Sequence, residues 1–222
     1  MLFIFDMGGV VARNVQTIPA MAKKLSLSSD EFFICCGIPE GTQRHAFYDH
    51  GLLAQIQSGA MSSIVFWNHF LSNAQEKLPK EHPGLKQIPL ITAKENLWAT
   101  CFKPEPIKEI VTLIETLKRK GHRVVCGTNT LDVHYEIHNR GKDYEPFHKV
   151  YASHLMGIIK PDTAFWTTIL DQEKMSRSQT IFIDDNHPNI DGAESLGIRS
   201  FLFTSPELLI RDFSKWTEDS RT

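Results

Sequence analysis

The stretch that decides the fold is Leu2-Phe3-Ile4-Phe5-Asp6-Met7-Gly8-Gly9-Val10-Val11. Its leading apolar residues predict a short buried strand, because the run is too short to make a helix by itself. Asp6 closes the run, and the glycine pair that follows lets the backbone turn sharply and approach a ligand closely. An aspartate that merely begins a turn has the same local pattern, so the interpretation depends on how the later strands end.

Strands and helices alternate through the second half of the chain. Apolar runs predict strands at 123–127, 149–153, 180–183 and 199–203, and amphipathic patterns predict helices at 106–120, 131–139, 163–170, 188–196 and from 206 onward. In the first of these helices, Pro106 suits the first turn and Gly121 ends the helix. Such alternation is typical of a parallel sheet with right-handed crossovers. The predicted fold class is therefore α/β, a three-layer, Rossmann-like parallel sheet.

Between residues 14 and 103 the pattern is helical. This part has no convincing β-branched run, and helix-like stretches occupy 18–25, 29–36, 42–58 and 62–78. Gly59 fits the C-terminal glycine of a helix, and Pro79, Pro83 and Pro89 indicate a loop-rich section. We therefore expect a core made of residues 1–13 and 104–222, with residues 14–103 inserted as a helical cap.

The composition is ordinary for a soluble globular protein. Of the 222 residues, 41% are hydrophobic and 23% are charged, and the chain is long enough to bury a proper core. A net charge of −2 offers no attraction to nucleic acid or to an anionic membrane. Four cysteines without metal-ligand spacing indicate free thiols in a reducing compartment. A membrane span needs about 18 consecutive apolar residues, and no apolar run approaches that length. We therefore expect a cytoplasmic protein without nucleic-acid or membrane partners.

Polar residues end three of the predicted strands: Asp6, then Thr128-Asn129, then Asp184-Asp185. Lys160 lies just before the helix at 163–170. In a parallel sheet these ends emerge at one edge, where residues distant in sequence converge. A carboxylate there can act as nucleophile, and two more can hold Mg²⁺. A hydroxyl, a lysine and glycine-loop amides can bind phosphoryl oxygens, so the pattern predicts phosphoryl transfer.

Four segments carry a resemblance to a known family. They are Phe5-Asp6-Met7-Gly8-Gly9-Val10, Gly127-Thr128-Asn129-Thr130, Gly157-Ile158-Ile159-Lys160-Pro161-Asp162, and Phe182-Ile183-Asp184-Asp185-Asn186 with Ile190, Gly192 and Ala193 beyond it. In this order and spacing they resemble the motifs of the haloacid dehalogenase superfamily over nearly the whole chain. The insert is similar to the family's C1 cap, which closes over the site and selects substrate. Within the family, the chain most resembles the glucose-1-phosphatase-type sugar-phosphate phosphatases and the phosphatase domain of epoxide hydrolase.

The resemblance implies a Mg²⁺-dependent phosphatase that hydrolyses a small phosphorylated metabolite, with sugar phosphates among the candidates. Asp6 is the expected nucleophile, which forms an aspartyl phosphate, and Lys160 is the second expected catalytic residue. The expected phosphate-binding residues are Met7, Gly8, Thr128, Asn129 and Lys160. The expected metal ligands are Asp6, the main-chain carbonyl of Gly8, Asp184 and Asp185. Asn129 and Asn189 are also expected to orient loops at the site. We expect a monomer or a homodimer.

Gly8 departs from the family pattern. Most phosphatases of the family carry a second Asp two residues after the nucleophile, and such a general acid contributes about 10²–10⁴-fold to the rate. Some members of the resembled subgroup also have glycine there, so a good leaving group, water or another residue would supply the proton. Two alternatives stay open. The first is a metal-independent 2-haloacid dehalogenase, although such an enzyme would not be expected to present Asp184-Asp185 together. The second is a non-catalytic phosphometabolite-binding protein, which Gly8 supports, although pure binding does not require the nucleophile, the lysine and the metal-binding carboxylates together.

Residues outside the four motifs are secondary candidates. His134 and His138 are either a metal-binding pair or pocket-edge histidines, and the lack of a third ligand at matching spacing favours the second. Arg13 either contacts substrate or is an exposed hinge residue. At most one of five aromatic residues is expected to touch substrate while the others pack: Phe66, Trp67, Phe70, Trp98 and Phe102. Polar candidates for reading the substrate are His45, Tyr48 and His50.

Overall fold

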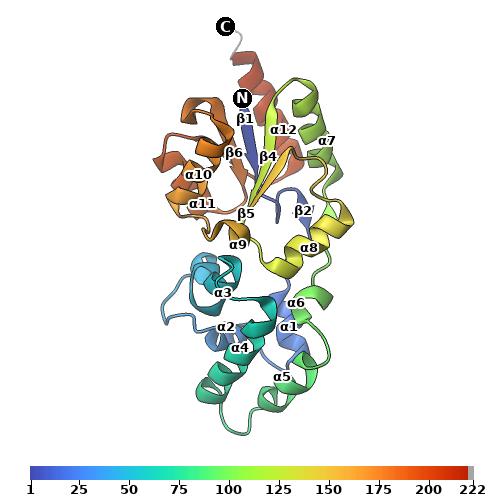
Figure 1. Cartoon of the computed structure of the whole chain (residues 1–222), viewed down its shortest axis with the longest axis vertical. Helices are drawn as coiled ribbons and strands as arrows, with labels where there is room; N and C mark the ends of the chain where they lie inside the picture. Colours follow the sequence, from blue (N-terminus) through green and yellow to red (C-terminus); the bar gives the residue numbers. More distant parts are fainter. Residues whose placement is uncertain (220–222) are drawn as a thin grey trace.

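A five-stranded parallel sheet lies in the upper half of the molecule, with helices on its two faces (Figure 1). The computed structural model describes the backbone of residues 1–219, and the side chains of that range except those of 45 and 214–219. The strand order is β5-β4-β1-β6-β7, and every neighbouring pair is parallel. The strands are β1 (Leu2–Phe5), β4 (Arg123–Thr128), β5 (Lys149–Ala152), β6 (Thr180–Asp184) and β7 (Arg199–Leu202).

Alternate side chains of β1 point to opposite faces of the sheet, as the two-residue period of a strand requires. Phe3 and Phe5 pack with α7 (Lys108–Arg119) and α12 (Pro206–Asp219). Leu2 and Ile4 pack on the other face with α10 (Thr163–Glu173) and α11 (His187–Ser195). All four side chains are fully buried. The expected three-layer α/β fold is therefore confirmed.

Three short elements complete this half of the molecule. They are α8 (Asp132–Gly141), α9 (Ser153–Met156) and the 3₁₀ helix η2 (Arg177–Gln179). Helices α8 and α9 follow β4 and β5, so they lie beside the carboxyl edge of the sheet, facing the lower half of the molecule (Figure 1).

Residues 18–100 form an all-helical group in the lower half (Figure 1), which we call the helical block. Its core is built around the stacked and tilted rings of Phe32, Phe66 and Phe70. Its elements are α1 (Ile18–Lys24), α2 (Ser29–Cys35), the 3₁₀ helix η1 (Arg44–Asp49), α3 (Gly51–Gln57), α4 (Ser63–Lys77), α5 (Gly84–Thr92) and α6 (Leu97–Thr100). The domain boundaries at 13/14 and 103/104 stay a prediction.

The two chain crossings between sheet and helical block are paired with each other. β2 (Ala12–Arg13) and β3 (Glu105–Pro106) form an antiparallel ribbon that the sequence did not indicate. Across it, Arg13 Nε donates to Glu105 Oε2 at 3.1 Å, and both side chains are exposed. This position agrees with the hinge alternative for Arg13.

The helix predicted from Pro106 begins two residues later, at Lys108. Pro106 belongs to β3, and Ile107 stays extended (φ −86°, ψ 103°). Its N–H donates to the Val11 carbonyl at 2.8 Å, which continues the ribbon and delays the first helical turn.

Two predictions inside the helical block were also wrong. The helix predicted over 42–58 is broken after Asp49, where His50 is extended (φ −131°, ψ 164°) and Gly51 takes a positive φ of 57°. The section predicted to be loop-rich contains α5, with Pro89 inside it. That helix persists because the fully buried Ile88 packs into the core of the block, which offsets the backbone hydrogen bond lost at proline.

Candidate active site

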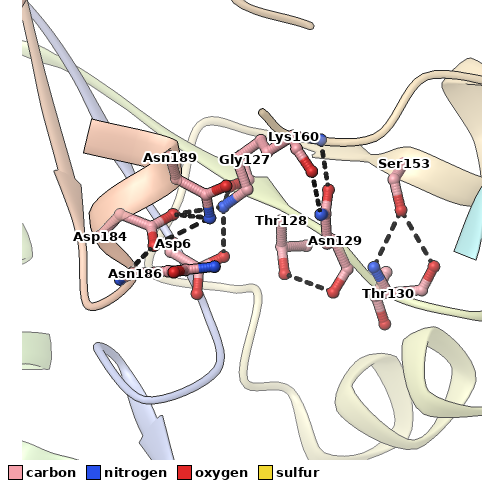
Figure 2. Close-up of polar contacts among 10 residues, drawn as sticks. All are labelled: Asp6, Gly127, Thr128, Asn129, Thr130, Ser153, Lys160, Asp184, Asn186 and Asn189. Atoms are coloured by element: carbon pink, nitrogen blue, oxygen red, sulfur yellow. Dashed lines mark hydrogen bonds and ion pairs between the residues drawn. The ribbon is translucent and has the colours of Figure 1, made fainter. Parts of the chain in front are cut away.

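The residues that end β1, β4 and β6 meet at one edge of the sheet because these three strands are neighbours. Asp6 directly follows β1, Thr128 is the last residue of β4, and Asp184 is the last residue of β6. Lys160 enters from the segment between α9 and α10, and Figure 2 shows it among the others. The predicted convergence of these side chains is thus present.

The ammonium group of Lys160 is the central cation of this site. Its Nζ donates to Asp6 Oδ1 at 2.7 Å, to Asp184 Oδ2 at 2.6 Å and to the Gly127 carbonyl at 2.9 Å (Figure 2). The residue is only 1% exposed. Burial by itself would lower the pKa of Lys160, but the two carboxylates raise it above its usual value. The lysine is therefore a fixed positive charge.

Opposing effects act on the pKa of Asp6. Burial raises the pKa of its carboxyl above the usual range, Lys160 lowers it, and the carboxylates of Asp184 and Asp185 raise it again. A lone ammonium does not neutralise three carboxylates, so the described cluster is short of positive charge. A bound cation would correct that imbalance.

Asp184 is held from several directions. Asn189 Nδ2 donates to both of its oxygens, at 3.0 and 3.1 Å, and the Asn186 backbone N–H donates to Oδ1 at 2.9 Å (Figure 2). The residue is fully buried. Asn189 therefore orients Asp184, which agrees with the orienting role expected of it.

A divalent cation fits the carboxylates of Asp6, Asp184 and Asp185. One oxygen from each lies within 4.8 Å of the others. Hard oxygen donors of this kind suit Mg²⁺. Gly9 makes room for the third carboxylate, because its φ is +84° and a Cβ there would overlap the Asp185 side chain. Burial and the neighbouring Asp184 raise the pKa of Asp185, so neutralisation by a cation would favour its charged form.

The side chain of Asn129 makes two hydrogen bonds to the backbone of Lys160. The Lys160 N–H donates to Asn129 Oδ1 at 2.8 Å, and Asn129 Nδ2 donates to the Lys160 carbonyl at 2.9 Å (Figure 2). Its side chain thus orients the lysine segment, the second role expected of it. Thr128 is buried, and its hydroxyl donates to the Asn129 carbonyl at a long distance of 3.4 Å. Phosphate binding by Thr128 and Asn129 stays a prediction.

Met7 and Gly8 form the turn that follows Asp6. The Met7 carbonyl accepts from the N–H groups of Val11 and Ala12 at 2.9 and 2.8 Å, while its side chain is buried in the core. Any phosphate contact of Met7 is therefore expected from its backbone. At Gly8, a Cβ would lie 3.4 Å from Val15 Cγ2, which is ordinary contact, so space alone does not require glycine there.

A cavity of about 430 Å³ joins these groups to the helical block. Asp6, Lys160 and Asp185 lie on its wall, and the opposite wall comes from η1, α3 and α6. Thr130 and Asn186, which lie in the quoted motif segments, also line the cavity. The lining residues that sequence reasoning missed are Val15, Gln16, Thr17, Arg44, Asp49, Leu53, Ile56, Gln57 and Leu131. Their spacing carries no motif, so only the fold reveals them.

His134 and His138 line this cavity but do not act as a pair. His134 Nε2 contacts the Trp98 carbonyl at 3.0 Å, and His138 Nδ1 contacts Asp143 Oδ2 at 2.7 Å. Phe102 stacks on the His134 ring with centroids 3.7 Å apart. Burial lowers the pKa of His134 to about 3. Within residues 1–219, the candidate metal cluster contains neither histidine, which favours the pocket-edge interpretation.

The other secondary candidates divide between cavity and core. Tyr48 lines the cavity, and so do Trp98 and Phe102 of the five aromatic residues. Which of them touches substrate stays a prediction. Phe66, Trp67 and Phe70 pack in the core of the helical block, as expected. His50 is the extended residue before α3 and is not among the lining residues, and the side chain of His45 lies outside those described.

A model of the haloacid dehalogenase-like hydrolases matches residues 1–197 of the chain. With the parallel sheet and the Asp6–Lys160–Asp184 contacts in place, the chain belongs to the haloacid dehalogenase-like hydrolases. In the described part of the chain, no helix has both the length and the apolar character needed to cross a bilayer.

Two of the similar proteins are phosphatases by name, and a third is a cyclase. The sesquiterpene phosphatase astK of Aspergillus oryzae is 31% identical over 100 residues, which make up 44% of this chain and 50% of that protein. The drimenol cyclase drtB of Aspergillus calidoustus is 33% identical over 96 residues, or 41% of this chain and 18% of that protein. The matches thus span half or less of these two relatives. The D-ribitol-5-phosphate phosphatase of Bacteroides thetaiotaomicron is 20% identical over 89% of each chain.

Solved structures share the fold. An enzyme of the family from Bacteroides thetaiotaomicron, solved with magnesium and inorganic phosphate, has a TM-score of 0.62 at 19% identity. The alignment covers 91% of this chain and 93% of that one. A hydrolase of the family from Porphyromonas gingivalis has a TM-score of 0.65 at 22% identity and covers 97% of both chains. At these identities the likeness shows the fold alone.

Proposed function

We propose that this hydrolase is a Mg²⁺-dependent phosphomonoesterase for a small phosphorylated metabolite, and that it works through an aspartyl phosphate on Asp6. The observation that carries the proposal is the cluster of Asp6, Asp184 and Asp185, whose oxygens lie within 4.8 Å of one another with Lys160 against two of them. Binding alone does not require a nucleophile, a fixed lysine and a set of metal-binding carboxylates in one place.

In the first step, a carboxylate oxygen of Asp6 attacks phosphorus, and the bond from phosphorus to the ester oxygen breaks as the new one forms. Lys160 holds Asp6 Oδ1 at 2.7 Å and so fixes the orientation of the carboxylate. Lys160 and Thr128 stabilise the charge on the phosphoryl oxygens. Mg²⁺ bound by Asp6, Asp184, Asp185 and the Gly8 carbonyl would offset the repulsion between the carboxylate and the phosphate.

In the second step, water attacks phosphorus and the bond between phosphorus and Asp6 breaks, which releases inorganic phosphate and restores the carboxylate. The alcohol that leaves in the first step takes its proton from water, because Gly8 has no proton to give. The hydroxide left behind is neutralised by the proton that the attacking water releases in the second step. Substrates with good leaving groups should therefore react fastest.

The helical block is the cap that the sequence predicts, and its wall of the cavity selects the organic part of the substrate. This wall combines apolar side chains with the polar Tyr48 and Gln57 and the charged Arg44 and Asp49. The relatives act, by name, on a sugar-alcohol phosphate and on sesquiterpene phosphates. A cavity of about 430 Å³ suits either kind of small molecule, so both are candidate substrate classes.

A hydrolysis screen with Mg²⁺ over sugar phosphates, prenyl phosphates, nucleotides and phospho-acids tests the proposal. We expect phosphate release that EDTA abolishes and Mg²⁺ restores. Halide release that survives EDTA would favour the dehalogenase alternative. Saturable binding of phosphorylated compounds without turnover would favour the non-catalytic alternative, for which Gly8 is the main support.

Two further properties belong to the same proposal. The four cysteines are free thiols, which suits a reducing compartment such as the cytoplasm. A monomer or a homodimer remains our expectation, and light scattering coupled to size exclusion would measure it.

A further inference from the structure

A buried hydroxyl joins the helical block to the loop expected to bind phosphate. Ser153, at the start of α9, is fully buried. Its Oγ accepts from the Thr130 N–H at 2.9 Å and lies 2.7 Å from the Gln57 carbonyl and 3.1 Å from the Thr130 carbonyl, to either of which it can donate. Figure 2 shows Ser153 and Thr130 beside Asn129. A hydroxyl has one proton, and the shorter distance assigns it to Gln57.

Gln57 makes this contact informative because it also forms part of the cavity wall. It is the last residue of α3, where the helix leaves carbonyl groups without an intrahelical partner. Its side-chain Nε2 donates to the Tyr48 carbonyl at 3.0 Å, and both residues line the cavity. The carbonyl that Ser153 holds thus belongs to the segment that would touch the organic part of a substrate.

Thr130 lies on the other side of the same hydroxyl. It comes two residues after Thr128 and directly after Asn129, which brackets Lys160. The loop is tied to the block a second time by Asp132, whose Oδ2 accepts from the Ser63 N–H at 3.2 Å and from Ser63 Oγ at 3.3 Å. Residues 128–132 are therefore held against the block near both α3 and α4.

We infer that Ser153 is a positioning residue. It couples the position of the helical block against the substrate to the positions of Thr128, Asn129 and Lys160 around the phosphate. The inference rests on the proposed phosphatase function. Ser153 is not among the residues that line the cavity, so it acts through Thr130 and Gln57. Displacement of reacting groups by about 1 Å can cost about 100-fold in rate, so such a tie has catalytic consequences.

The test compares Ser153→Ala with Thr180→Val. Thr180 is also buried, and its hydroxyl donates to the Ser176 carbonyl at 2.9 Å, at the opposite end of β6 from the site. Each variant therefore loses one buried hydroxyl. We expect Ser153→Ala to lower kcat for p-nitrophenyl phosphate at least about 10-fold and to weaken inhibition by inorganic phosphate. Thr180→Val should lose stability without either change, and Ser153→Thr should restore part of the activity.

Amide hydrogen exchange without substrate gives a second readout. In Ser153→Ala we expect faster exchange both in residues 51–58 and in residues 128–132, because one hydroxyl makes a hydrogen bond to each segment. If Ser153→Ala fails to fold, Ser63→Ala tests the other tie and should shift exchange and kcat in the same direction, but less, because the Ser63 N–H still reaches Asp132.

The outcomes separate the two proposals. An active wild-type chain with unchanged kinetic constants and unchanged exchange at 51–58 in Ser153→Ala would refute the positioning role alone. A wild-type chain that releases no phosphate from any substrate would refute the proposed function and, with it, this inference.

Discussion

Asn129 and Lys160 exchange two hydrogen bonds, with the lysine N–H donating to Asn129 Oδ1 at 2.8 Å and Asn129 Nδ2 donating to the lysine carbonyl at 2.9 Å. The pair fastens the end of β4 to the segment that carries the ammonium group. Because that ammonium contacts both Asp6 and Asp184, the geometry of the whole acidic cluster depends on this backbone clasp.

Loss of the two hydrogen bonds between Asn129 and the Lys160 backbone should therefore impair catalysis. We predict that Asn129→Ala lowers kcat about 10- to 100-fold for any phosphate ester, because the lysine segment loses both fixed contacts. Asn129→Asp keeps an acceptor for the lysine N–H and should lose less. Steady-state kinetics with p-nitrophenyl phosphate measures both variants, and equal rates for Asn129→Ala and wild type would show that the clasp is not needed.

Asp6→Asn should abolish hydrolysis while the fold stays intact, because an amide oxygen is too weak a nucleophile to form the acyl phosphate. Turnover of an aryl phosphate measures activity, and thermal unfolding measures stability. Asp191→Asn, at an exposed position on α11, is the matched control and should keep full activity. Undiminished activity in Asp6→Asn would sink the nucleophile assignment.

Gly8→Asp should raise the turnover of alkyl phosphates. The Cβ that it adds lies 3.4 Å from Val15 Cγ2, which is ordinary contact, and the new carboxyl would supply a proton to a poor leaving group. We expect the rate for an alkyl phosphate to rise about 10-fold or more relative to that for p-nitrophenyl phosphate, whose leaving group needs little help. Gly8→Asn has nearly the same shape without the exchangeable acid. The same gain in both variants would argue against proton transfer as the cause.

Mg²⁺ should stabilise the folded chain through the acidic cluster. A ligand that binds only the native state raises the melting temperature as its concentration rises. We predict such a rise for wild type and a clearly smaller one for Asp185→Asn, which removes one of the three carboxylates. Asp191→Asn again serves as control. Differential scanning fluorimetry with and without Mg²⁺ makes the comparison, and an equal rise in wild type and Asp185→Asn would remove Asp185 from the site.

Stability should fall in mild acid because of His134. Burial lowers the pKa of this imidazole to about 3 in the folded chain, whereas an unfolded histidine titrates near 6.5. Between these values the unfolded state binds the extra proton, so the contribution is complete above about pH 6.5 and is lost as the pH falls towards 3. The expected loss approaches about 1.4 kcal/mol per pH unit from this group.

His134→Gln should flatten this pH dependence, since the carboxamide keeps an N–H for the Trp98 carbonyl but does not titrate. Urea unfolding at pH 7.5 and pH 5 measures the change. A slope identical to that of wild type would mean that other groups cause the acid sensitivity.

Local pattern was sufficient for much of the fold. The apolar runs and their order predicted the five parallel strands, and the polar residues after three of them predicted a shared edge. Pattern failed where a distant partner overrides local preference. Ile107 stays extended because it bonds to Val11, and Pro89 stays inside a helix because Ile88 is buried. Neither partner is visible in a short window of sequence.

The motif side chains and their convergence followed from chain order and residue type, because the carboxyl ends of parallel strands must meet at one edge. Three-dimensional packing alone decided how those side chains are held and which others face them. The ion pair of Lys160 with Asp6 joins residues 154 apart, and the contact of Ser153 with Gln57 joins residues 96 apart. Such contacts depend on how the helical block lies against the sheet, and no periodic pattern within either segment encodes that arrangement.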